Sequence, residues 1–133
     1  MTTGFHATDR AVFRVSGGEA RKFLQGWVTN DVDRIDDGPV YAAVLTPQGK
    51  YLFDFFLIAD GDDLLLDVKA EAAPALARRL SLYKLRADVT VEATDLAIVV
   101  GHGDTPAAPG AFTDPRHSGL GWRAVGPDAT ALL

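Results

Sequence analysis

The most hydrophobic part of the chain, residues 40–58, consists of two apolar segments separated by a turn sequence. The turn is T-P-Q-G at residues 46–49, with proline where a type I turn favours a fixed φ and glycine where the chain leaves the turn. This pattern predicts a β-hairpin. Because its strands carry apolar side chains on both faces, we expect the rest of the protein to cover both faces.

One acidic residue, Asp54, interrupts the second strand of this hairpin. Side chains alternate between the two faces of a strand, so Asp54 should share a face with Leu52, Phe56 and Ile58. A carboxylate among such side chains costs on the order of several kcal/mol unless it is paired, hydrogen-bonded or protonated. Two interpretations follow. Asp54 is a structural acid satisfied by backbone amides or by an arginine such as Arg86, or it binds a ligand with basic ring nitrogens.

The other hydrophobic patterns predict two helices and further strands. The first helix follows S-G-G-E at residues 16–19, which fits a capping box. Its apolar stripe consists of Ala20, Phe23, Leu24, Trp27 and Val28. The second helix begins near Pro74, a residue that the first turn of a helix tolerates. Strands are expected at residues 11–15, 64–68, 89–93, 96–100 and 122–125, the last of them a short edge strand.

The resulting order, β-α-β-β-β-α-β-β, predicts an α+β fold in which two helices cover one face of a mainly antiparallel sheet. Residues 103–121 are rich in Gly, Pro, Asp and Ala and predict a long loop. Residues 126–133 read as the start of another helix, so we expect the chain to be the N-terminal portion of something longer.

Composition narrows the function classes. The chain has 133 residues, 47% hydrophobic and 23% charged, which fits one globular domain at residues 1–133. A net charge of −5 argues against direct nucleic-acid binding. Without cysteine there is no disulfide or thiolate chemistry, and the spacing of its three histidines suits no metal. The N-terminus is unlike a signal peptide and no apolar run has membrane length, so we expect a cytoplasmic protein without a membrane partner.

Several segments resemble, in the same order, the folate-binding YgfZ-type proteins, which are relatives of the aminomethyltransferase (T-protein) of the glycine cleavage system. These segments are F-L-Q-G-W-V-T-N-D-V (23–32), Y-A-A-V-L-T-P-Q-G-K-Y-L-F-D-F-F (41–56), L-L-L-D-V-K-A-E (64–71), L-Y-K-L-R-A-D-V (82–89), D-P-R (114–116) and L-G-W-R (120–123). The resemblance implies the first domain of a three-domain fold that holds tetrahydrofolate at its centre.

The same resemblance implies a ligand site for tetrahydrofolate or another folate derivative. Asp54 would accept paired N–H bonds from the pterin ring, and this pairing would offset its burial. Asn30, Tyr83 and Arg86 would lie nearby, with Arg86 suited to the glutamate carboxylates of the folate. Arg10, which precedes the first strand, would be a further ligand contact. No catalytic residue is assigned.

The resemblance also bears on activity. T-protein relatives carry G-G-x-x-D-D after the hairpin turn, whereas residues 49–54 read G-K-Y-L-F-D, with Phe53 in place of the first acid. This difference favours the YgfZ-type proteins, which are linked to folate-dependent assembly or repair of iron–sulfur clusters and thereby to tRNA modification. Iron–sulfur proteins are the implied partners of a protein that is not an enzyme by itself. The alternatives are an aminomethyltransferase and a non-catalytic interaction domain. YgfZ-type proteins also carry K-G-C-Y-x-G-Q-E, which we expect beyond Leu133.

Overall fold

The computed structural model describes residues 3–84, 86–107, 110–116, 118–126 and 129. In this part of the chain the strands form two antiparallel sheets. The strands are β1 (Thr3–His6), β2 (Arg10–Ser16), β3 (Val40–Leu45), β4 (Tyr51–Asp60), β5 (Asp63–Lys69), β6 (Thr90–Ala93), β7 (Ala97–His102), β8 (Ala111–Thr113) and β9 (Trp122–Gly126). The α-helices are α1 (Ala20–Gln25) and α2 (Ala73–Lys84), and the 3₁₀ helices are η1 (Val32–Asp36), η2 (Ala70–Ala72) and η3 (Ser118–Leu120).

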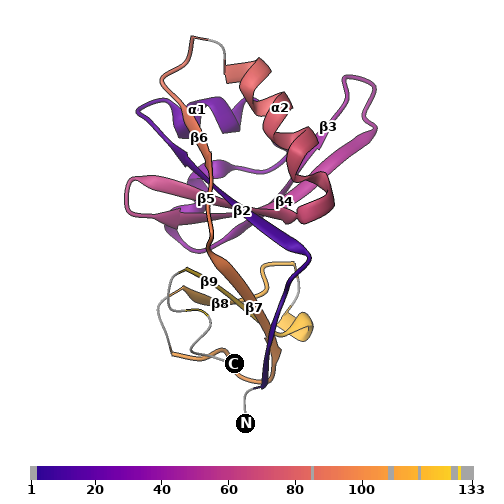
Figure 1. Ribbon diagram of the computed structural model, residues 1–133, viewed down its shortest axis with the longest axis vertical. Helices are drawn as coiled ribbons and strands as arrows, with labels where there is room; N and C mark the ends of the chain where they lie inside the picture. Colours follow the sequence, from indigo (N-terminus) through magenta and orange to yellow (C-terminus); the bar gives the residue numbers. More distant parts are fainter. Residues whose placement is uncertain (1–2, 85, 108–109, 117, 127–128, 130–133) are drawn as a thin grey trace.

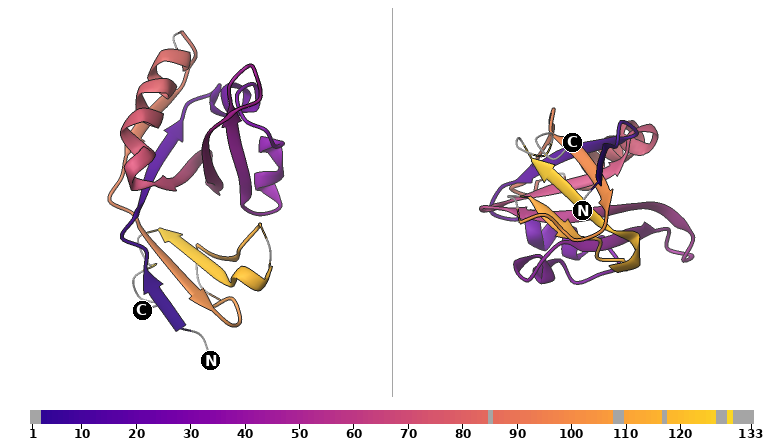
Figure 2. Two further views of the ribbon diagram at one scale, coloured as in Figure 1. Left: turned by 90° about the vertical axis from the view of Figure 1, so that its right-hand side faces the viewer. Right: turned by 90° about the horizontal axis from the view of Figure 1, so that it is seen from below.

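The larger sheet has the strand order β3-β4-β5-β2-β6, and the smaller sheet has the order β1-β7-β9-β8. The larger sheet and both α-helices form the upper part of Figure 1, and the smaller sheet forms the lower part. In the left view of Figure 2, the larger sheet and α2 lie above and the smaller sheet lies below them. The predicted α+β class is confirmed, with two sheets where the sequence pattern suggested one.

The two faces of the larger sheet belong to separate cores. On one face, α1, α2 and η1 pack on the strands, and the buried side chains there include Phe13, Val15, Leu24, Ile35, Phe53, Phe55, Leu57, Leu66, Leu76 and Leu80. On the other face, Val12, Phe56, Ile58 and Leu65 pack against Ile98 and Val125 of the smaller sheet. Burying a side chain of this size is worth about 1.5–3 kcal/mol. Both faces of the predicted hairpin are therefore covered, as its sequence indicates.

The predicted hairpin is present as β3 and β4, but it contains a β-bulge. Val44 pairs with Phe53 and Leu45 pairs with Tyr51, so Leu52 is an extra residue in β4. Leu52 consequently packs into the helix-side core next to Phe53. The expectation that Leu52 shares the face of Asp54 is therefore wrong, because the bulge interrupts the alternation.

The start of α1 also differs from the expectation. No capping box forms, because Ser16 belongs to β2 and Glu19 directly precedes the helix without a side-chain cap. Instead, the Glu19 carboxylate accepts a hydrogen bond from the Asp88 N–H (2.5 Å), and the Asp88 carboxylate accepts one from the Gly18 N–H (3.0 Å). These two bonds tie the start of α1 to the segment before β6. The apolar stripe keeps its role, because Trp27 and Val28 pack on the helix-side core beyond the end of α1.

The smaller sheet was the part least visible in the sequence pattern. β9 is not an edge strand, since it lies between β7 and β8 and its first four residues are buried. β8 and η3 lie inside the predicted long loop, and β1 was not predicted. Most of the helix start expected at residues 126–133 falls outside the described residues. None of the helices that the structure describes is long and apolar enough to cross a membrane.

Candidate functional site

Asp54 lies on the face of β4 that is turned toward the smaller sheet, and two tyrosines bind its carboxylate. The Tyr41 hydroxyl donates to one oxygen and the Tyr51 hydroxyl donates to the other at 2.5 Å. Tyr51 would lie on the opposite face of a regular strand, and the bulge at Leu52 brings it to the side of Asp54. The acid is therefore satisfied by side chains of its own hairpin, and it is half-buried.

The two tyrosines and the acid change each other's proton affinity. Burial raises the pKa of Asp54, but hydrogen bonds from both hydroxyls and the positive charges of Lys69 and Arg10 together bring it below its ordinary value. Burial and the hydrogen bond to Asp54 raise the pKa of Tyr41 to about 12. Asp54 is therefore an ionised acceptor at neutral pH, and both hydroxyls keep their protons.

Tyr41 connects Asp54 to a pocket between the two sheets. The Asn30 side-chain amide donates to the Tyr41 backbone carbonyl at 3.0 Å, and the Asn30 oxygen accepts from the Arg34 guanidinium at 3.3 Å. From the other side, the Arg116 guanidinium carbon lies 5.6 Å from the centre of the Tyr41 ring. One tyrosine thus contacts the acid through its hydroxyl and the pocket through its ring and backbone.

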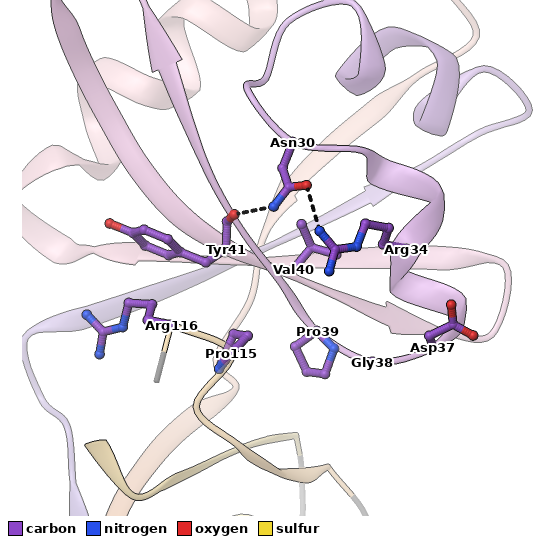
Figure 3. Close-up of a pocket in the computed structure, with 9 residues that line it drawn as sticks. All are labelled: Asn30, Arg34, Asp37, Gly38, Pro39, Val40, Tyr41, Pro115 and Arg116. Atoms are coloured by element: carbon purple, nitrogen blue, oxygen red, sulfur yellow. Dashed lines mark hydrogen bonds between the residues drawn. The ribbon is translucent and has the colours of Figure 1, made fainter. Parts of the chain in front are cut away.

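We call this cavity the inter-sheet pocket, and its volume is about 340 Å³. Its lining residues are Asn30, Arg34, Asp37, Gly38, Pro39, Val40, Tyr41, Pro115 and Arg116. Figure 3 shows the guanidinium groups of Arg34 and Arg116 on opposite sides of it, with Asn30 on a third side and the two prolines facing Asn30. A cavity of this size fits a small molecule.

The position of Arg116 is fixed by a buried acid. Its Nε and Nη2 donate to the two oxygens of Asp114 at 3.0 and 2.7 Å, and its backbone N–H donates to the same carboxylate at 2.9 Å. Asp114 is only 4% exposed. Burial raises the pKa of Asp114, but the bonds from Arg116 outweigh this effect and the net pKa is lowered. The D-P-R turn therefore holds a guanidinium at the pocket through a charged, bidentate pair.

A second ion-pair cluster joins the two sheets. Asp67 of β5 is fully buried and accepts from Arg10 of β2 and from Arg123 of β9, each at 2.7 Å. The Arg123 guanidinium carbon lies 4.3 Å from the centre of the Phe56 ring. Within the described residues, the Nε atom of Arg123 is buried without a hydrogen-bond partner. The most deeply buried acid of the larger sheet is therefore Asp67, in the run L-L-L-D-V, and not Asp54.

The structure brings together some of the predicted site residues and separates others. Asn30 and Asp54 are linked through Tyr41. Arg10 lies on the same face of the sheet, but its guanidinium is bound to Asp67. Arg86 is exposed and follows α2, whose C-terminal end lies at the top of Figure 1, so the structure does not place it with Asp54. Tyr83 lies in α2, and its side chain is outside the described part of the structure.

Sequence reasoning missed Tyr41, Tyr51, Arg34 and Arg116. A signal for Tyr41 was present, since alternation along β3 places it on the face of Asp54 in any hairpin of this register. Arg116 gave no such signal, because it reaches the pocket from a turn that precedes the last strand of the other sheet. Together these residues offer an anionic acceptor at one end, an aromatic ring in the middle and two guanidinium groups along the pocket. That combination suits an elongated, ring-containing anion.

Comparison with known proteins identifies relatives of this chain. No family model matches the chain. The mitochondrial iron–sulfur cluster assembly factor IBA57 homolog of Pyricularia oryzae is 34% identical over 141 residues, which span 95% of this chain and 36% of that protein. Human IBA57 is 28% identical, spanning 97% of this chain and 44% of that protein. The tRNA-modifying protein YgfZ of Escherichia coli O157:H7 is 32% identical, spanning 70% of this chain and 29% of that protein. The chain thus spans less than half the length of these relatives.

A solved structure shares the fold. The glycine cleavage system aminomethyltransferase T of Bartonella henselae superimposes with a TM-score of 0.67 at 20% identity, covering 75% of this chain and 28% of that protein. The predicted T-protein-like architecture is confirmed. The expectation of a cytoplasmic protein is wrong, because the IBA57 relatives, from fungi and human, are mitochondrial proteins.

Proposed function

The chain belongs to the family of YgfZ and the iron–sulfur cluster assembly factor IBA57, and from this premise we propose that it takes part in iron–sulfur cluster assembly and binds tetrahydrofolate, or a derivative of it, at Asp54 and the inter-sheet pocket. The family relation supports the first part of the proposal. The connection of Asp54 to the pocket through Tyr41 supports the second part. Through the clusters it helps to assemble, the protein would support enzymes that modify tRNA, and its partners would be iron–sulfur proteins.

The chemistry of the site fits a pterin at Asp54. An ionised carboxylate has acceptor positions beyond the two that the tyrosine hydroxyls occupy, and an aminopyrimidinone ring offers adjacent N–H donors. Tyr41 adds an aromatic edge beside the acid, and Asn30 fixes the backbone of Tyr41. We assign no ligand contact to Arg10, whose Nε is held by Asp67 at 2.7 Å.

The arrangement supports binding more directly than aminomethyl transfer. Phe53, which replaces the first acid of the T-protein pattern, is 8% exposed and packs into the helix-side core. The position next to Asp54 in β4 therefore carries no second carboxylate. The likeness to aminomethyltransferase T is a likeness of fold.

Isothermal titration calorimetry with tetrahydrofolate tests the proposal. We expect Asp54→Asn to weaken binding by about tenfold or more, because an amide cannot accept two charge-assisted bonds. Asp60→Asn is the matched control, since Asp60 is an exposed acid at the far end of the same strand. Equal affinity of the Asp54→Asn variant and the wild type would refute the role of Asp54. For the cellular role, loss of the protein should lower the activity of iron–sulfur enzymes, and the wild type should restore it better than Asp54→Asn.

A further inference from the structure

The guanidinium groups of Arg34 and Arg116 in the inter-sheet pocket have N–H donors that are not used within the described residues. A guanidinium carries five N–H donors. Within the described residues, Arg116 donates from its Nε and from one Nη2 hydrogen to Asp114, and Arg34 donates from one Nη1 hydrogen to Asn30. Each group is therefore held in place by a neighbour while it keeps unused donors. Held guanidiniums with free donors are preorganised to bind oxyanions.

The charge and shape of the pocket point to a ligand with two anionic groups. Its lining carries two arginines against one carboxylate, Asp37. Figure 3 shows Arg34 and Arg116 on opposite sides of the cavity, so each guanidinium faces the pocket from its own side and can bind an anionic group of its own. Pro39 and Pro115 form a wall that loses little conformational entropy on binding.

We propose that the inter-sheet pocket is a dicarboxylate site, in which Arg34 and Arg116 each bind one carboxylate. The inference rests on the proposed function for the source of the dicarboxylate, which is the glutamyl end of a folate whose pterin lies at Asp54. In this arrangement Tyr41 separates the ring end of the ligand from its anionic end. Arg34 and Arg116 would thereby bind the glutamate carboxylates that the family resemblance assigns to Arg86, which lies beyond the end of α2.

The test uses the full chain and three probes. γ-Glutamylglutamate carries the carboxylates without the ring, pteroate carries the ring without the glutamate, and inorganic phosphate is a compact anion. Binding is followed by calorimetry and by the NMR shift of the Asn30 side-chain amide. We expect γ-glutamylglutamate to bind, to shift the Asn30 signal, and to bind about tenfold more weakly to Arg34→Gln. Arg79→Gln, on the exposed side of α2, is the matched control and should bind as the wild type does.

Arg34 is the decisive position because it is exposed and its change leaves the buried Asp114 pair intact. Arg116→Gln should weaken binding too, and its thermal unfolding is measured alongside, since it loses that pair. Equal affinity of wild type and Arg34→Gln for γ-glutamylglutamate, or tighter binding of phosphate at the same residues, would overturn the dicarboxylate site. Binding of γ-glutamylglutamate without binding of pteroate would support the site and overturn the folate assignment instead.

Discussion

At the scale of single residues, Asp54 illustrates how a hairpin accommodates an acid in an apolar strand. Two tyrosine hydroxyls, one from each strand of the hairpin, replace the water that burial removes. Because the folded protein lowers the pKa of Asp54, the stability that this acid contributes is complete above the pKa of the unfolded chain, near 4, and is lost as pH falls through the folded value. The contribution of Tyr41 to stability depends on pH in the opposite direction. Its raised pKa contributes stability below pH about 10 that is lost as pH rises toward 12.

This coupling predicts a titration. In Asp54→Asn, the pKa of Tyr41 should fall below its wild-type value of about 12. It should stay above the ordinary tyrosine value, because burial, the larger cause of the shift, remains. The ultraviolet absorbance of phenolate, recorded against pH for the wild type, Asp54→Asn and Tyr41→Phe, isolates the Tyr41 transition. An unchanged transition in Asp54→Asn would contradict the coupling.

At the scale of elements, the sequence pattern was sufficient where partners are neighbours in the chain. β3, β4 and β5 follow one another and carry long apolar runs, and α2 has a clear helical stripe. The pattern failed where the partner is remote. β1 pairs with β7, and the three-residue β8 is defined by β9 rather than by its own side chains. Ser16 reads as a helix cap locally, yet its pairing with Thr90 keeps it in β2.

Close packing between backbones gives a prediction for the smaller sheet. Gly121 has φ +89°, and a Cβ there would lie 2.0 Å from the Gly101 carbonyl oxygen of β7. Gly49 has a similar φ of +84° in the hairpin turn, with no heavy atom within 4 Å of such a Cβ. We expect Gly49→Ala to cost about 1–2 kcal/mol through backbone conformation. Gly121→Ala should cost about 2 kcal/mol more, because backbone must also move.

Urea unfolding of the two glycine variants checks this difference. Both carry the same left-handed penalty, so the excess in Gly121→Ala reports the contact between the turn and β7. Equal losses in the free energy of unfolding would show that this contact relaxes without cost.

At the scale of the whole molecule, the two sheets are held together by a small apolar core and by charges. Asp67 of the larger sheet binds Arg123 of the smaller one, and Arg116 lies 5.1 Å from the Phe56 ring. The candidate site lies at this junction, which explains why half of it was predictable. Asp54 is an anomaly within an apolar strand and Asn30 follows from the family resemblance, whereas Arg116 acquires its role only when the second sheet docks.

The buried charge cluster predicts a large effect from one substitution. Asp67→Asn should lower the free energy of unfolding by about 3–5 kcal/mol, because it leaves Arg10 and the buried Arg123 without their carboxylate. Asp60→Asn, which removes an exposed partner of Arg14, should cost less than about 1 kcal/mol. Chemical denaturation measures both values. Similar small losses would mean that the junction does not depend on the buried pair.

The pairing of β1 with β7 has a consequence for how the protein is made. Thr3 lies opposite His102, so β1 must wait until every strand of the larger sheet has been synthesised before its hydrogen-bonding partner exists. Such a non-local pairing closes late and slowly, whereas β2 to β5 can pair as they emerge. Until β7 emerges, the nascent chain therefore carries an unpaired β1, whose Phe5 is 56% exposed even in the folded structure, and the inter-sheet pocket cannot close before the turn that carries Arg116 has docked.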